Sequence, residues 1–133
     1  MAAEGVVTIE SAFSYRETLD RLKAEFEPRG LTLFAAIDHA KNAEEAWLTL
    51  RPSVVLVFGN AKTGTPLMQA NQAAGIDLPL KTLVWEDAGG KTLVYYNDPV
   101  WIARRHGLTG EVFEIAEKMR TGLEALVGSA ARS

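Results

Sequence analysis

The segment that most constrains the fold is an apolar run followed by a turn bounded by glycines. Residues 53–58 read Ser-Val-Val-Leu-Val-Phe, and Gly59 and Gly64 enclose the polar stretch that follows. A short run that is apolar at successive positions predicts a central strand covered on both faces. Thr65 and Pro66 suit the N-cap and the first position of a helix. The segment therefore predicts a strand, a loop and a helix that begins at Pro66.

The two glycines have the spacing of the phosphate-binding loop of nucleoside triphosphatases. That loop continues with a lysine and a serine or threonine, which hold the outer phosphates and Mg²⁺. Thr65 and Pro66 occupy those positions here, so the sequence excludes such an enzyme. Two interpretations stay open. The backbone N–H groups and polar side chains at the helix start could bind an anion, or the loop is purely structural.

Helical spacing of apolar residues predicts two main helices, at 15–27 and 112–126. Ser14 and Glu17 form a capping box before the first helix, and Gly30 follows its end. Shorter helices are expected after Asn42 and after Asp98. Trp47 and Leu48 are expected to pack inward from the first of these. Further strands are expected at 6–11, 31–37, 80–86 and 91–96, the last two joined as a hairpin through 87–90.

These elements predict an α+β fold with a largely antiparallel sheet of about five strands. Two main helices are expected on one face of the sheet, with short connecting helices elsewhere. A single domain would span 5–127, and 128–133 would be a frayed tail. The uncovered sheet face would bury strand 53–58 and the aromatic residues Trp85, Tyr95 and Tyr96 against a second copy, so we expect a homodimer.

The charge and residue composition limit the classes of partner that the chain is expected to bind. The chain has 14 basic and 17 acidic residues, a net charge of −3, and no long run of like charge. This argues against nucleic acid and against an anionic membrane surface as partners. Apolar runs are too short to span a bilayer, and the N-terminus has no signal-peptide pattern, so a cytoplasmic location is expected. Two histidines and no cysteine make a metal site unexpected.

Polar residues at strand ends are the candidates for a site. The residues proposed to bind a ligand are His39, Asn60, Lys62, Thr63, Gly64, Thr65, Gln69 and Asn97. His39 follows Asp38, which could orient it as a general base, although neighbouring strand residues point to opposite faces. His106 is expected to interact with a helix C-terminus. The sequence assigns no catalytic residue and no cofactor.

Three functions therefore remain open. The first is a domain that binds or senses a small molecule, possibly an anion, in one pocket formed by the 59–69 loop with His39 and Asn97 at neighbouring strand ends. The second is an enzyme centred on His39, with the loop amides as an anion hole. The third is a structural or dimeric interaction module whose loop only holds the fold.

A set of short motifs along the chain resembles a known family. The motifs are Phe13-Ser14-Tyr15, Ile37-Asp38-His39-Ala40, Leu50-Arg51-Pro52, Phe58-Gly59-Asn60, Gly64-Thr65-Pro66-Leu67-Met68, Ile76-Asp77-Leu78-Pro79-Leu80 and Tyr96-Asn97-Asp98-Pro99. Together they are similar to the prokaryotic domain of unknown function 302, over roughly residues 5–127. The resemblance implies a compact α+β fold of the TATA-binding-protein-like class and homodimers, with no established activity. Ala61 stands where the family has a proline.

Overall fold

The computed structural model describes residues 2–132. Strands and helices follow one another in the order β1 (Val6–Glu10), α1 (Tyr15–Phe26), β2 (Thr32–Asp38), α2 (His39–Glu45), β3 (Ser53–Gly59), α3 (Ala61–Ala70), β4 (Leu80–Glu86), β5 (Thr92–Asn97), α4 (Pro99–Arg105) and α5 (Gly110–Ala131). Short 3-10 turns follow α1 at Glu27–Arg29 and α3 at Gln72–Ile76. The predicted α+β class is confirmed.

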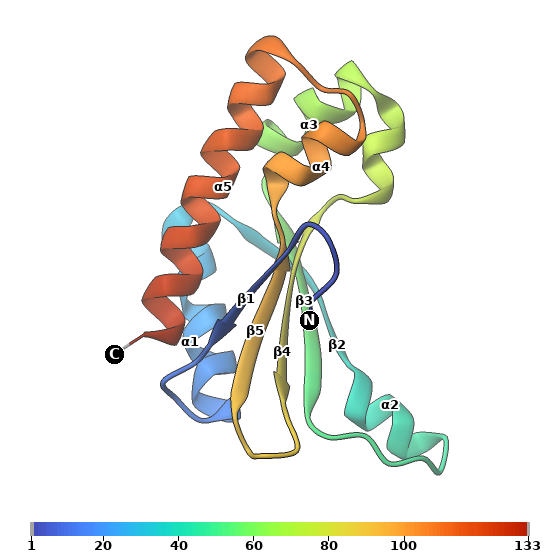
Figure 1. Cartoon of the computed structure of the whole chain (residues 1–133), viewed down its shortest axis with the longest axis vertical. Helices are drawn as coiled ribbons and strands as arrows, with labels where there is room; N and C mark the ends of the chain where they lie inside the picture. Colours follow the sequence, from blue (N-terminus) through green and yellow to red (C-terminus); the bar gives the residue numbers. More distant parts are fainter. Residues whose placement is uncertain (1, 133) are drawn as a thin grey trace.

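The strands form one antiparallel sheet in the order β1-β5-β4-β3-β2 (Figure 1). The predicted hairpin joins β4 to β5, where the Asp87 carboxylate accepts hydrogen bonds from the N–H groups of Gly89 and Lys91, both at 2.9 Å. β3 lies between β4 and β2, as expected for a central strand, but its residues alternate between buried and partly exposed, so the prediction that both of its faces are covered was wrong. The apolar run of β3 reflects an uncovered apolar face as well as a buried one.

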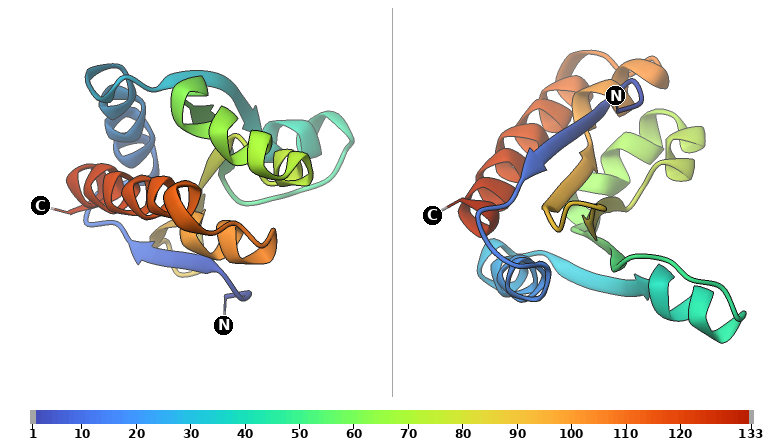
Figure 2. Two further views of the ribbon diagram at one scale, coloured as in Figure 1. Left: turned by 90° about the horizontal axis from the view of Figure 1, so that it is seen from above. Right: turned by 60° about the horizontal axis from the view of Figure 1, so that its bottom comes forward.

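Helices α1 and α5 pack side by side on one face of the sheet, as predicted (Figure 2). Alternate strand residues point into this layer, among them Leu56, Phe58, Val84 and Val94, all with 0% exposure. Phe26 of α1 stacks on the Phe58 ring with 4.4 Å between centroids. Burying each such side chain contributes about 1.5–3 kcal/mol, so this layer is the main source of stability.

A second, smaller cluster lies against the N-terminal half of α5, where α3 and α4 pack (Figure 1). Its buried members are Leu67, Ala103, Leu108 and Ala116. Since α5 contacts both clusters, it links the sheet layer to the α3–α4 end of the molecule.

The C-terminal part of α5 is longer than expected. The helix continues to Ala131, so residues 128–131 are helical and not frayed. Arg21 of α1 explains this, because its guanidinium donates to the carbonyl oxygens of Ser129 and Ala130 at 3.1 and 2.9 Å. The predicted tail also includes Ser133, which lies outside the described residues.

Residues 39–52, which we call the arm, project from the body at the end of β2 (Figure 1). Trp47 and Leu48 are 95% and 68% exposed, so the prediction that they pack inward was wrong. The helix in the arm starts earlier than expected, because Asp38 and not Asn42 caps it. Trp47 also has a φ of 63°, a left-handed conformation that bulky residues rarely adopt.

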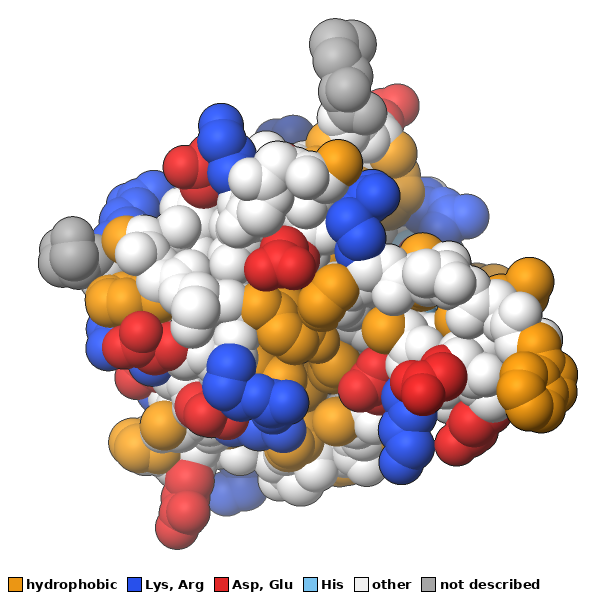
Figure 3. Space-filling view, turned by 90° about the horizontal axis from the view of Figure 1, so that it is seen from below, with side chains coloured by type: hydrophobic (Ala, Val, Ile, Leu, Met, Phe, Trp, Pro, Cys, Tyr) orange, Lys and Arg blue, Asp and Glu red, His pale blue; other side chains and the backbone are white. Residues whose placement is uncertain are grey.

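The sheet face opposite α1 and α5, which we call the open face, carries apolar side chains that no helix covers. Its partly exposed members are Val55, Val57, Leu83, Trp85, Leu93 and Tyr95. Tyr96, expected on this face, points into the helix layer and is 4% exposed. Seen from below, hydrophobic side chains gather near the centre of the molecule and at the edge where the arm lies (Figure 3).

Candidate functional site

The candidate site begins where β3 turns into α3. Asn60 has extended backbone angles, and its side-chain oxygen accepts from the N–H of Lys62 at 2.8 Å, so it is the N-cap of α3. The Asn60 amide nitrogen donates to the carbonyl of Gly30 at 3.3 Å, and the Thr63 hydroxyl donates to the Asn60 carbonyl at 3.0 Å. These bonds hold the start of the helix against the end of α1.

The predicted helix start at Pro66 was therefore wrong. Helix α3 begins at Ala61, Thr65 is not its cap, and Pro66 lies inside it. Asn60 takes the N-cap role instead of Thr65 because an asparagine side-chain oxygen accepts well from an N–H group in the first turn of a helix. Ala61, where the related family has proline, is the first helical residue, a position that proline also suits. The departure at this position leaves the turn intact.

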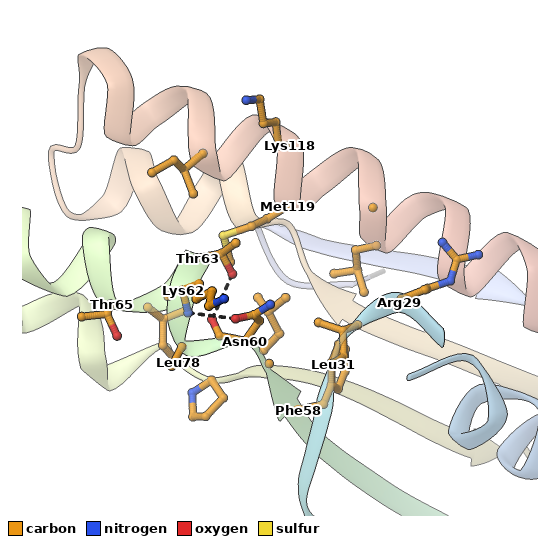
Figure 4. Close-up of a pocket in the computed structure, with 18 of the residues that line it drawn as sticks. Arg29, Leu31, Phe58, Asn60, Lys62, Thr63, Thr65, Leu78, Lys118 and Met119 are labelled. Carbon is orange, nitrogen blue, oxygen red and sulfur yellow. Dashed lines mark hydrogen bonds between the residues drawn. The ribbon is translucent and has the colours of Figure 1, made fainter. Parts of the chain in front are cut away.

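A cavity of about 740 Å³ opens beside this helix start (Figure 4). It lies between α3, α5, the chain after α1 and the segment before β4. Its apolar walls are formed by Leu31, Phe34, Phe58, Met68, Leu78, Pro79, Leu80, Ile115, Met119, Leu123 and Leu126. In Figure 4, Met119 reaches from α5 toward Thr63, so the two helices form facing walls. Small-molecule sites typically measure about 300–1,000 Å³ and have mostly apolar walls.

The charges at this cavity are all positive. Arg29, Lys62 and Lys118 line it from three different segments and are exposed. Among the described residues that line it, none is an aspartate or a glutamate. Arg29 also pairs with Glu25, at 3.4 Å, and Glu25 is not among the lining residues. The cavity thus joins apolar walls to a cationic rim.

The structure brings five of the eight predicted site residues together. Asn60, Lys62, Thr63, Gly64 and Thr65 line the cavity. Gln69 is exposed on α3, and Asn97 ends β5, both outside the cavity lining.

His39 lies at the opposite end of the sheet from the cavity. Its neighbour Asp38 pairs with Val54, five residues from Gly59 in β3, which places the two ends roughly 17 Å apart. The Asp38 carboxylate accepts from the N–H of Lys41 at 2.9 Å and caps α2. The expected single pocket of His39 and the 59–69 loop therefore does not form, because antiparallel β2 carries His39 away from it.

Sequence reasoning missed the wall contributed by α5. Ile115, Met119, Leu123 and Leu126 share one stripe of this helix, and a stripe of this kind usually indicates core. Gly122 was the available signal, because glycine is costly inside a helix. A Cβ atom at Gly122 or at Gly64 would have no neighbour within 4 Å. The two glycines leave space in the cavity that larger side chains would occupy.

A separate polar cluster involves His106, at the end of α4. Its Nε2 lies 2.6 Å from the Asp77 carboxylate, and Arg105 donates to the same carboxylate at 2.9 Å. Asn71 donates to the His106 carbonyl at 2.9 Å. These contacts join α4 to the chain after α3, so His106 binds a side chain and does not only meet a helix terminus.

Residues 2–132 also bear on metal and membrane binding. Over residues 2–132, no group of three histidine, aspartate or glutamate side chains is arranged to hold a metal ion. In the same range, no helix is both long enough and apolar enough to cross a membrane.

The fold places the chain in the class of small α+β domains with one antiparallel sheet. The family model described as "Domain of unknown function DUF302" matches residues 7–126, and the chain belongs to this family. The solved structure titled "Crystal structure of uncharacterized conserved protein DUF302 from Bacillus stearothermophilus" has the same fold, with a TM-score of 0.85. It is 21% identical, and the match covers 96% of this chain and 99% of that one.

Two curated relatives are longer proteins. "Fluoride-specific ion channel FluC 1" of Brucella suis biovar 1 is 44% identical over 104 residues, which are 78% of this chain and 41% of that protein. The protein of the same name from Brucella abortus biovar 1 shows the same identity over 38% of its length. The chain thus spans about two fifths of the length of these relatives.

Proposed function

We propose that this chain binds a small organic anion in the cavity beside α3. One observation carries the proposal: the cavity of about 740 Å³ combines apolar walls with Arg29, Lys62 and Lys118 at its rim. A pocket with this lining favours a ligand that is apolar in part and negatively charged in part. Of the residues proposed from the sequence, Asn60, Lys62, Thr63, Gly64 and Thr65 belong to the proposed site.

Binding has more support than catalysis, because polar side chains at this cavity are already used in hydrogen bonds within the protein. Asn60 and Thr63 already make the hydrogen bonds that start α3, at 2.8 and 3.0 Å. A general base must reach its substrate within hydrogen-bond distance. His39 would have to act from roughly 17 Å away, measured along the sheet. The enzyme alternative centred on His39 therefore has less support than binding.

The names of the Brucella relatives refer to fluoride. A cavity with this volume and these apolar walls is far larger than one halide ion needs, so the proposal does not carry fluoride over to this chain. Fluoride is nevertheless a useful comparison ligand.

We also propose the cytoplasmic location that the sequence predicts.

We also propose that the chain forms a homodimer through the arm and the open face. Trp47, Leu48 and Leu50 are 95%, 68% and 51% exposed at the end of the arm. The open face offers Val55, Val57 and Trp85 as uncovered apolar partners. Exposed apolar surface of this kind typically marks an interaction site. The arm of each protomer would then lie on the open face of its partner.

A thermal-shift experiment tests ligand binding. Carboxylates of increasing size, inorganic phosphate and fluoride are added to the wild-type protein and to Lys62→Gln, with Lys41→Gln as a control outside the cavity. A ligand at 100 times its Kd stabilises the folded state by about 2.7 kcal/mol, which raises the Tm of a domain of this size by roughly 10 °C. We expect a rise with organic carboxylates that Lys62→Gln reduces. No shift with any carboxylate would contradict the proposal.

A further inference from the structure

Building on the proposed function, we infer that the ligand is a single-chain fatty acid, with its carboxylate at the rim of the cavity and its alkyl chain along α5. The walls, the rim charge and the two glycines support this inference separately. It names the ligand class, which the family description leaves unassigned.

The shape of the apolar wall suits an extended chain. The α5 residues that line the cavity run along one stripe from Ile115 to Leu126, a separation of eleven residue steps. At 1.5 Å per residue, this wall is roughly 16 Å long. An extended chain advances about 1.2 Å per bond, judged from the reach of extended backbone, so the wall matches roughly a dozen bonds. Phe58 of β3 and Leu80 of β4 also line the cavity.

The charge distribution suits one anionic head. Arg29, Lys62 and Lys118 are exposed, whereas the apolar wall residues Phe58, Leu80 and Leu123 are buried. A carboxylate at the rim would therefore stay partly hydrated while it meets positive charge. An uncharged chain of the same length would lose this attraction, and a short anion would lose the apolar contacts.

The glycines on the two helical walls keep the space for the chain. Gly64 lies on α3 and Gly122 on α5, and a Cβ at either position meets no atom within 4 Å. Neither has the positive φ that would require glycine. A larger side chain fits the fold at both positions but would occupy the cavity, so the space itself can be removed by substitution.

The first experiment compares four probes by isothermal titration calorimetry, with every probe below its micelle concentration. Dodecanoate should bind, and decanoate should bind roughly 15-fold more weakly, since each buried methylene contributes about a fourfold factor. Dodecanol, which lacks the charge, should bind at least about tenfold more weakly. Acetate, which lacks the chain, should show no measurable binding.

The outcomes separate this inference from the proposal on which it rests. If acetate or phosphate bound as tightly as dodecanoate, the fatty-acid class would be wrong while anion binding stood. If dodecanol bound as tightly as dodecanoate, the role of the cationic rim would be wrong. If none of the probes bound, the inference and the anion proposal would both lose their support.

The second experiment uses Gly122→Leu, with Ala125→Leu as the matched control on the exposed side of the same helix. Both variants should fold, because leucine favours a helix more than glycine does and nearly as much as alanine does, and circular dichroism checks this. Gly122→Leu should weaken dodecanoate binding at least 20-fold, whereas Ala125→Leu should leave it unchanged. Unchanged binding in a folded Gly122→Leu protein would overturn the inference. A change from dimer to monomer in that variant, with unchanged binding, would identify the groove as a subunit contact instead.

Discussion

Asp98 and Arg120 form a two-point ion pair that joins the start of α4 to the middle of α5. Arg120 Nε donates to Asp98 Oδ1 at 3.0 Å, and Nη2 donates to Oδ2 at 2.5 Å. Asp98 Oδ1 also accepts from the N–H of Val100 at 2.9 Å, which makes Asp98 the N-cap of α4, as the sequence predicted. One carboxylate therefore caps one helix and anchors it to another.

Asp98→Ala should destabilise the fold more than Asp98→Asn does. Alanine removes both the cap and the ion pair, whereas asparagine keeps a good cap oxygen. Loss of a cap costs about 1 kcal/mol, and loss of the charge leaves Arg120 without its partner. We expect the free energy of unfolding to fall by about 2–3 kcal/mol for alanine and about 1–2 kcal/mol for asparagine. Urea denaturation at neutral pH measures both, and equal losses would contradict the capping role.

The contribution of Asp98 should depend on pH. Burial alone would raise the pKa of Asp98, but the hydrogen bonds from Arg120 and from the Val100 N–H outweigh it and hold the pKa below its ordinary value of 3.8. A carboxyl group with a lowered pKa stabilises the fold above its unfolded pKa, and this is lost as pH falls through the folded pKa.

The difference in unfolding free energy between wild type and Asp98→Asn should therefore stay constant from about pH 8 to about pH 5 and shrink below about pH 4. Urea denaturation across this range measures the difference. A difference that grew on acidification would show that the pKa is raised.

Thr82→Val should stabilise the protein. Thr82 has 0% exposure, and its hydroxyl oxygen has no hydrogen-bond partner among the described residues. Valine has nearly the same shape and removes the unpaired group, so the free energy of unfolding should rise by about 1 kcal/mol.

Thr18→Val is the matched control for this substitution. Thr18 also has 0% exposure, but its hydroxyl lies 2.6 Å from that of Ser11. Here valine should lower the free energy of unfolding by about 1–3 kcal/mol, because the Ser11 hydroxyl loses its shortest hydrogen bond. Effects of the same sign in both variants would contradict the explanation.

Trp47→Gly should weaken self-association without destabilising the protomer. The indole is 95% exposed, so its removal costs no core packing, and glycine adopts the φ of 63° without strain. If the arm lies on the open face of a partner, the dimer Kd should rise at least about tenfold, as for other tryptophan anchors.

Sedimentation equilibrium measures this Kd, and urea denaturation in the monomeric range checks the protomer. Trp47→Ala separates the two effects, because it removes the side chain but keeps the backbone strain. An unchanged Kd in both variants would exclude the arm from the interface.

Local patterns predicted most of the fold. Ser14 caps α1, and Asp98 caps α4 with Pro99 behind it, because cap chemistry depends on neighbouring residues alone. The same logic failed at α3, where the sequence predicted Thr65 as the cap and the structure has Asn60 in that role. The prediction for Trp47 was wrong because helical spacing of an apolar residue does not show whether the rest of the protein packs against that side of the helix.

The candidate site was predicted only in part, for a reason of sequence separation. Asn60 to Thr65 are contiguous, so one loop brought them together. Met119 and Gly122 lie more than fifty residues further along, and only tertiary packing sets them opposite that loop. His39 was included because it ends a strand, but the antiparallel pairing of β2 with β3 places the end of β2 beside the start of β3, away from the loop.

The arm and the open face are different surfaces carried by the same molecule, which limits the symmetry of any assembly that joins them. A two-fold axis lets both arms meet both faces at once, and growth stops at two copies. A head-to-tail arrangement either closes into a ring of more copies or leaves one arm and one face free at the ends, so that the contact repeats into an open filament. The direction in which the arm leaves β2 thus decides between a closed pair, a ring and a filament.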